Sequence, residues 1–226
     1  MSILVVMISY TLGAIPFGLL LVRWKTGKDV RLVGSGRTGT TNSMRAAGYP
    51  VGILTLILDM LKGMGTVWLA KWLAPGIEWA LVGAPLAAIL GHNYSIFLAE
   101  RGADGRVRLR GGAGGAPALG GAVGLYPLNL VILVGVGLIM FFGVGYASLA
   151  TMSVGVTATI VFAMRAWLGY SPWIYVLYGV FAEALLLWAL RPNIRALIDG
   201  TERGVGWRAK NASAAPENGK EDSTPK

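Results

Sequence analysis

The chain has 226 residues, of which 54% are hydrophobic and only 14% charged, and its formal net charge is +9. Charged residues make up about a quarter of an ordinary soluble domain, so this composition predicts an integral membrane protein. The lack of cysteine excludes disulfides, thiolate catalysis and cysteine-ligated metals, and a single histidine argues against a histidine-based metal site. The basic residues gather in a few hydrophilic segments between apolar stretches, which is typical of membrane topology rather than of nucleic-acid binding.

Apolar stretches long enough to be membrane-spanning helices follow one another along the chain, since about 20 apolar residues cross the hydrocarbon core. The predicted spans are 3–21, 51–72, 79–98, 113–126, 128–145, 147–167 and 172–190. The first has no basic start and reaches its first charge only at Arg23, so we read it as a span rather than as a cleaved signal. The fourth is short and rich in Gly and Ala, which predicts a helix that is tilted and enclosed by protein, or partly re-entrant.

Basic residues are concentrated in the first loop, in the third loop and after the last span. The positive-inside rule places these three segments in the cytoplasm and the N-terminus outside, which requires an odd number of spans. The sequence therefore predicts an all-α integral membrane domain over residues 1–208 with seven transmembrane helices and a cytoplasmic C-terminus. Residues 209–226 are polar and lack an apolar period, which predicts a disordered cytoplasmic tail.

The first loop carries the segment V-G-S-G-R-T-G-T-T-N-S-M-R at 33–45. Its glycines allow sharp turns, its hydroxyl and amide groups are short hydrogen-bonding side chains, and Arg45 supplies a fixed positive charge. Such a loop is suited to holding a phosphate, although a flexible connector would have a similar composition. It is neither a Walker A motif nor a dinucleotide fingerprint.

Further polar candidates lie at the ends of, or within, the predicted spans. Asp59 and Lys62 are three residues apart and share a helix face, where they form either a functional pair in a polar cavity or a structural ion pair. His92 and Asn93 lie near the cytoplasmic end of the third span, as either site residues or satisfied packing residues. Glu183 in the last span is read as structural.

Two more segments fall on the same side of the membrane. R-L-R-G-G-A-G-G-A at 108–116 is a second glycine-rich turn flanked by arginines. L-R-P-N-I-R-A-L-I-D-G-T-E at 190–202 follows the last span and contributes Asn193 and Glu202 as polar candidates. Because all of these groups converge on the cytoplasmic face, they favour a phosphate-bearing substrate whose lipid tail runs into the bilayer.

Five motifs in this order resemble the small bacterial acyl-phosphate:glycerol-3-phosphate 1-acyltransferases. The motifs are G-S-G-x-x-G-x-T-N with a following Arg at 34–45, D-x-x-K-G at 59–63, G-H-N-[FY] at 91–94, R-G-G-x-G at 110–114 and N-I-x-x-L-x-x-G-T-E at 193–202. The resemblance covers about residues 13–202. It implies a seven-span enzyme of the bacterial cytoplasmic membrane with an outside N-terminus and a cytoplasmic active site. The implied reaction transfers a fatty acyl group from acyl-phosphate to the 1-hydroxyl of glycerol-3-phosphate, without a metal or a cofactor.

The resemblance also implies site residues. The predicted catalytic residues are Ser35, Arg45, His92 and Asn193, and the predicted substrate-binding residues are Gly34, Gly36, Thr40, Thr41, Asn42, Asp59, Lys62, Asn93, Arg110, Gly111, Gly112 and Glu202. In these roles Ser35, Thr41 and Asn42 would hold the acyl-phosphate, and Arg45 and Asn193 would bind the phosphate of glycerol-3-phosphate.

The chain departs from the family pattern at four positions. Arg37 stands in place of an Asn, Ala113 in place of a Lys, Pro117 in place of a Thr and Leu190 in place of a His. Residues 100–108 also resemble an insertion. Loss of a phosphate-binding Lys requires a replacement charge, for which Arg37, Arg108 and Arg110 are the candidates. Two other interpretations stay open: a diverged member with another donor or acceptor, and a non-catalytic lipid-binding or transport protein on the same scaffold.

Overall fold

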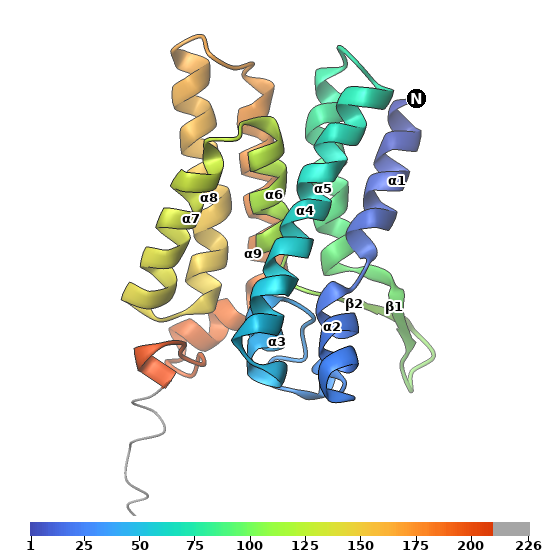
Figure 1. Cartoon of the computed structure of the whole chain (residues 1–226), viewed down its shortest axis with the longest axis vertical. Helices are drawn as coiled ribbons and strands as arrows, with labels where there is room; N and C mark the ends of the chain where they lie inside the picture. Colours follow the sequence, from blue (N-terminus) through green and yellow to red (C-terminus); the bar gives the residue numbers. More distant parts are fainter. Residues whose placement is uncertain (210–226) are drawn as a thin grey trace, which may run out of the picture.

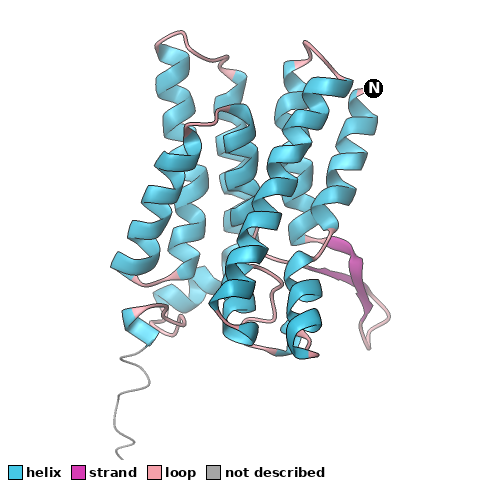
Figure 2. Cartoon of the chain, viewed as in Figure 1, coloured by secondary structure: helices cyan, strands magenta, loops and turns pink. Residues whose placement is uncertain are grey.

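The computed structural model describes residues 1–209, which form a bundle of long helices with a cluster of short elements at one end (Figures 1 and 2). In chain order the elements are α1 (Ser2–Ala14), α2 (Phe17–Thr26), the 3-10 turn η1 (Val30–Leu32), α3 (Thr40–Ala47), α4 (Tyr49–Leu73), α5 (Glu78–Asn93), β1 (Ser95–Arg101), β2 (Val107–Arg110), α6 (Gly115–Leu125), α7 (Asn129–Leu138), the π-helical turn η2 (Ile139–Val144), α8 (Ala147–Trp167) and α9 (Ile174–Ile198).

Within residues 1–209, four helical segments are long and apolar enough to cross a membrane. They are Ser2–Thr26, Tyr49–Leu73, Ala147–Trp167 and Ile174–Ile198. Two further apolar helices, Gly115–Leu125 and Asn129–Val144, are shorter than that criterion requires. The prediction of a helical integral membrane fold is thus confirmed, while length and composition alone support four spans and not seven.

The first predicted span is not one continuous helix. Helix α1 ends at Ala14, and α2 begins at Phe17. Pro16 explains the break, because a proline lacks an N–H group and restricts the preceding residue to extended conformations, and Ile15 has φ −60° and ψ 118°. The break exposes the carbonyl oxygen of Ile15, which accepts a hydrogen bond from the Lys62 ammonium at 2.9 Å.

The third predicted span, 79–98, is wrong at its C-terminal end. Helix α5 stops at Asn93, and the next residues form strand β1, which pairs antiparallel with β2 (Figure 2). The strand can form because Val107–Arg110 offers a pairing partner across a short turn. The hairpin is the one departure from an all-helical fold in the described residues, and it contains most of the segment that resembles an insertion.

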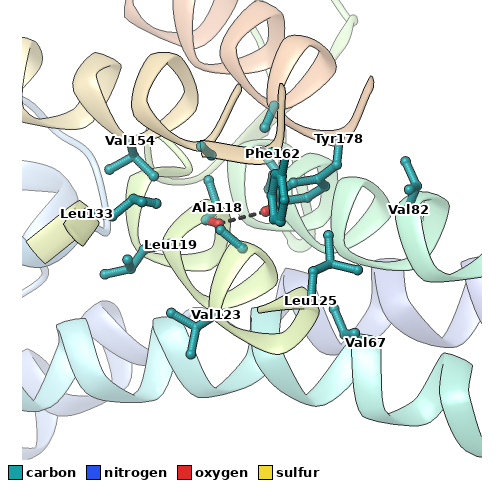
Figure 3. Close-up of a cluster of buried hydrophobic side chains, with 14 of the residues drawn as sticks. Val67, Val82, Ala118, Leu119, Val123, Leu125, Leu133, Val154, Phe162 and Tyr178 are labelled. Atoms are coloured by element: carbon teal, nitrogen blue, oxygen red, sulfur yellow. Dashed lines mark hydrogen bonds between the residues drawn. The ribbon is translucent and has the colours of Figure 1, made fainter. Parts of the chain in front are cut away.

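Helix α6, the fourth predicted span, lies in the centre of the bundle, and all residues from Pro117 to Leu125 are buried. Its side chains join the main core cluster with Phe162 of α8 and Tyr178 of α9 (Figure 3). The Tyr178 hydroxyl donates a hydrogen bond to the Ala118 carbonyl at 2.6 Å, so the one polar atom of this buried ring is satisfied. The expectation that protein encloses this short helix is confirmed.

The polar elements lie at one end of the bundle. Figure 1 shows α2, α3, the β1–β2 hairpin and the segment after α9 at the end opposite the N-terminus. Residues 203–208 dock on the α7–α8 connection, where Arg208 Nε donates to the Val144 carbonyl at 2.7 Å and the Val205 N–H donates to Gly145. The predicted disordered tail, 209–226, lies outside the described residues apart from Ala209.

Candidate active site

The first glycine-rich loop is held in shape by the buried side chain of Asn42. Its amide nitrogen donates to the carbonyl oxygens of Val30, Val33 and Arg37 at 2.8–2.9 Å. Its amide oxygen accepts from the Ser35 N–H at 3.2 Å. Both amide hydrogens are used inside the protein, so Asn42 has no free donor and its main role in the structure is to shape the loop. Gly34, with φ +54°, leaves room for the Asn42 amide, because a Cβ at this position would overlap Oδ1.

The N–H groups that remain for an anion lie at the start of α3 and not in the middle of the loop. The N–H of Gly36 donates to Val33, and that of Thr38 donates to Gly111. The first N–H groups of a helix have no helical partner, and here they belong to Thr40 and Thr41. The loop thus delivers the positive end of a helix dipole to the site.

Arg37 emerges from this loop toward α9. One guanidinium nitrogen, Nη2, donates to the Ala189 carbonyl at 2.5 Å. The other, Nη1, is buried and has no hydrogen-bond partner. Pro192 lies inside α9 and has no N–H group, so the helix lacks the backbone hydrogen bond to the Trp188 carbonyl. That carbonyl accepts from the Arg191 side chain instead. Burial lowers the pKa of Arg37 from its ordinary value, although a guanidinium stays charged at neutral pH.

Arg45, on the last turn of α3, faces the segment that follows α9. There the Asn193 amide donates to both carboxylate oxygens of Glu202, at 2.9 and 3.1 Å. Burial and the neighbouring charge of Arg203 lower the pKa of Arg45. Two arginines facing a single carboxylate leave a net positive charge that suits a phosphate.

His92, Asp59 and Lys62 form a buried cluster beside the first loop. Lys62 Nζ lies 2.8 Å from Asp59 Oδ1 and 3.0 Å from His92 Nδ1. His92 Nδ1 also lies 3.6 Å from Asp59 Oδ1. The shorter contact is with the Lys62 ammonium, which has only donors, so we assign Nδ1 as the acceptor and the imidazole proton to Nε2. His92 therefore presents an N–H donor on the opposite side of its ring.

The second glycine-rich loop packs directly on the end of α5. The Gly112 N–H donates to the His92 carbonyl at 2.9 Å. A Cβ at Gly111 would overlap the backbone of His92 and Asn93, and one at Gly112 would overlap His92 Nε2. These two glycines allow the close packing that positions the His92 imidazole.

These groups border two connected chambers and a groove. The transfer chamber is lined by Ser35, Arg37, Gly39, Thr40, Thr41, Asn42, Arg45, Asp59, His92, 113–116, Ala147, Ser148, Thr151, Leu190, Asn193 and Glu202. The outer chamber is lined by Gly34, Ser35, Arg37, Arg45, Pro192, Asn193, Ala196, Thr201, Glu202 and Arg203. The apolar groove runs from Thr40 and Thr41 between α4, α6, α7, η2 and α8.

The structure brings most of the predicted site residues together. Those that line the transfer chamber are Ser35, Thr40, Thr41, Asn42, Arg45, Asp59, His92, Asn193 and Glu202, and Gly34 lines the outer chamber. Those that line neither chamber are Gly36, Lys62, Asn93, Arg110, Gly111 and Gly112. Arg110 points away, because its Nε lies 2.9 Å from Glu100 in the hairpin. Glu183 lines neither chamber and packs against Gly155 of α8.

Of the polar residues that line the transfer chamber, Ser148 and Thr151 were not among the predicted site residues, and Arg37 was predicted only as a candidate for the replacement charge. The structure places Arg37 on the wall of both chambers, with one buried guanidinium nitrogen that has no hydrogen-bond partner. Ser148 lines the transfer chamber at the start of α8, and its hydroxyl is buried without a hydrogen-bond partner. In the sequence, Ser148 is distinguished only as a small polar residue at the beginning of an apolar stretch, and many helices have such a residue at this position.

Residues 3–200 match the family model described as glycerol-3-phosphate acyltransferase. The glycerol-3-phosphate acyltransferase of Rubrobacter xylanophilus is 41% identical over 214 residues, which cover 92% of this chain and 98% of the relative. An enzyme of the same name from Thermus thermophilus is 37% identical over 206 residues, with 90% and 95% covered.

Solved structures of PlsY, an integral membrane glycerol 3-phosphate acyltransferase, share the fold. Its glycerol 3-phosphate form superposes with a TM-score of 0.77 at 31% identity and covers 95% of this chain and 99% of that one. Its lysophosphatidic acid form gives 0.74 at 30% identity, with 91% and 95% covered. The order of the five motifs, the loop geometry and these similarities agree, and the chain belongs to the glycerol-3-phosphate acyltransferase family.

Proposed function

We propose that this protein transfers a fatty acyl group from acyl-phosphate to the 1-hydroxyl of glycerol-3-phosphate and so forms 1-acyl-glycerol-3-phosphate. The observation that carries the proposal is the junction of two environments. The polar transfer chamber, whose wall includes Arg37 and Arg45, and the apolar groove share the wall residues Thr40, Thr41, Gly115, Ala116, Ala147 and Thr151. A molecule with a phosphate at one end and an acyl chain at the other fits across that wall.

The two phosphates have separate positions in this arrangement. The donor phosphate lies in the transfer chamber against the N-terminus of α3, and its acyl chain occupies the apolar groove. The acceptor phosphate lies in the outer chamber near Arg45 and Arg203. The acceptor hydroxyl then reaches the carbonyl carbon at the boundary of the two chambers, so that proximity supplies a large part of the rate.

The chemistry needs no strong base on the protein. An acyl-phosphate is a mixed anhydride with a good leaving group. The hydroxyl oxygen forms the new ester bond, the bond between the carbonyl carbon and the phosphate oxygen breaks, and the leaving phosphate takes the hydroxyl proton. With the imidazole proton assigned to Nε2, His92 serves as a hydrogen-bond donor to developing negative charge rather than as the proton acceptor.

The topology proposed for the enzyme follows the loop charges. Seven membrane crossings, an outside N-terminus and an active site on the cytoplasmic face of the bacterial inner membrane agree with the basic segments at 23–45, 101–110 and 191–208. The polar elements gather at the end of the bundle opposite the N-terminus (Figure 1), which supports this orientation.

The test is acyl transfer from palmitoyl-phosphate to radiolabelled glycerol-3-phosphate by the purified, folded protein. We expect lysophosphatidic acid as the product, no transfer from palmitoyl-coenzyme A, and a loss of at least about 100-fold in Arg45→Ala, whose side chain lines both chambers. The matched control is Arg106→Gln, an arginine on the exposed hairpin turn outside the chambers. Absence of product from the folded wild type, or full activity in Arg45→Ala, would overturn the proposal.

A further inference from the structure

We propose that Arg37 binds the donor phosphate in the transfer chamber and is a catalytic residue of this enzyme. The inference rests on the proposed function and assigns the cation that faces the leaving group. Arg37 lines both chambers, next to Leu190 on the wall of the transfer chamber.

The position of Arg37 is fixed from both ends. At its backbone, the carbonyl oxygen accepts from Asn42 Nδ2 at 2.8 Å, so the loop cannot shift without breaking the Asn42 network. At its tip, Nη2 is anchored to the Ala189 carbonyl of α9. With these two anchors the guanidinium plane is held, and Nη1 is left as a buried donor without a partner. A preorganised donor of this kind is what stabilises charge that develops on a substrate.

Arg37 also has no direct ion-pair partner. In residues 1–209 no carboxylate lies within ion-pair distance of its guanidinium, and Glu202 acts on it only from farther away. A partly buried guanidinium without a close counter-ion is costly, and a bound phosphate would reduce that cost. The other carboxylate on the wall of the transfer chamber, Asp59, is already paired with Lys62 at 2.8 Å.

The hairpin arginines are engaged elsewhere. Arg110 pairs with Glu100 at 2.9 Å, and Arg108 pairs with Asp104 at 3.0 Å. Two arginines, Arg37 and Arg45, line both chambers, and Arg203 lines the outer chamber alone. Arg45 shares the outer chamber with Arg203, where the acceptor phosphate is placed, so Arg37, which α9 anchors, is assigned to the donor phosphate.

The experiment compares steady-state kinetics of the full-length protein with palmitoyl-phosphate and glycerol-3-phosphate as substrates. Arg37→Gln is expected to lower kcat/KM for palmitoyl-phosphate about 10- to 100-fold, the effect of losing a charged hydrogen bond, while KM for glycerol-3-phosphate changes less than about threefold. The control, Arg106→Gln, also removes one arginine charge and is expected to leave both constants unchanged.

A second-site change separates binding from structure. Ala113 lies on the wall of the transfer chamber, so Ala113→Lys adds an ammonium there without restoring the hydrogen bond to Ala189. We expect Arg37→Gln/Ala113→Lys to recover most of the lost kcat/KM. A loss that Ala113→Lys does not relieve, or an Arg37→Gln enzyme with wild-type kinetics, would overturn the role of Arg37.

Folding of the variants is checked by thermal unfolding in detergent. If Arg37→Gln does not fold, Arg37→Lys is the substitute, because it keeps the charge and loses the planar fork. We expect it to raise KM for palmitoyl-phosphate several-fold, and an unchanged KM would overturn the proposal. Absence of turnover in the wild type would instead refute the proposed function itself, so the two failures are distinguishable.

Discussion

Replacing Lys62 by Met tests whether the buried cluster of Asp59, Lys62 and His92 is held together by charge. Asp59 and Lys62 are 1% and 4% exposed at their side chains, and their charged atoms lie 2.8 Å apart. Removing one partner of a buried pair leaves the other charge uncompensated, which costs about 3–5 kcal/mol. In a chain of this size each kcal/mol lowers the melting temperature by about 2–4 °C, so Lys62→Met should unfold roughly 6–20 °C below the wild type.

The double variant Asp59→Asn/Lys62→Met is the matched comparison, because it removes both charges and leaves no lone carboxylate. We expect it to recover more than half of the lost melting temperature in detergent-solubilised protein. Its acyl transfer should stay low, because His92 Nδ1 no longer faces an ammonium group and the Nε2–H tautomer is no longer fixed. Equal melting temperatures for the single and double variants would refute the reasoning that a bare buried charge causes the loss.

Three further changes have defined outcomes. Asn42→Ala removes the four hydrogen bonds that shape the first loop and should lower the free energy of unfolding by about 2–6 kcal/mol, measured by thermal or denaturant unfolding, with loss of activity. Gly112→Ala pushes a methyl group into His92 Nε2 and should lower kcat at least about tenfold, whereas Gly135→Ala, which meets no atom within 4 Å, should leave kcat unchanged in the same assay. Glu202→Ala removes the carboxylate that holds the Asn193 amide in one orientation, so KM for glycerol-3-phosphate should rise about tenfold with little change in KM for the acyl donor. A rise in both KM values would show that the outer chamber does not select the acceptor.

Residue spacing predicted that the first loop turns sharply, because its glycines and short polar side chains act locally. Gly34 is needed for a left-handed turn against Asn42, and α3 begins directly after the loop at Thr40. Such features depend on residues a few positions apart, which a sequence shows directly. The same holds for the enclosed α6 helix, whose Gly and Ala residues allow its neighbours to approach closely.

Long-range partners were beyond the reach of the sequence. The resemblance to the family implied that Arg110 binds substrate, whereas the structure pairs it with Glu100 in the hairpin and places it outside both chambers. The end of α5 was placed five residues too late for a related reason, because strand pairing with Val107–Arg110 competes with helix continuation and is not visible in apolar content. A long-range contact has the opposite effect on Arg37: the Ala189 carbonyl of α9, 152 residues away, holds its guanidinium at the site.

The phosphate-facing cation and the asparagine that shapes the first loop tolerate change differently. This difference explains why the shape of the loop was more predictable from the sequence than the position of the cation. A phosphate dianion accepts hydrogen bonds over most of its surface, so a cation can reach it from Ala113's side of the chamber or from Arg37's side with similar effect. The amide of Asn42 has no such freedom, because its four partners are backbone groups at fixed positions. On the role proposed for Arg37, a chain with Ala113 can therefore still bind the donor phosphate, because another cation faces the same chamber, whereas loss of the loop-shaping asparagine has no equivalent replacement.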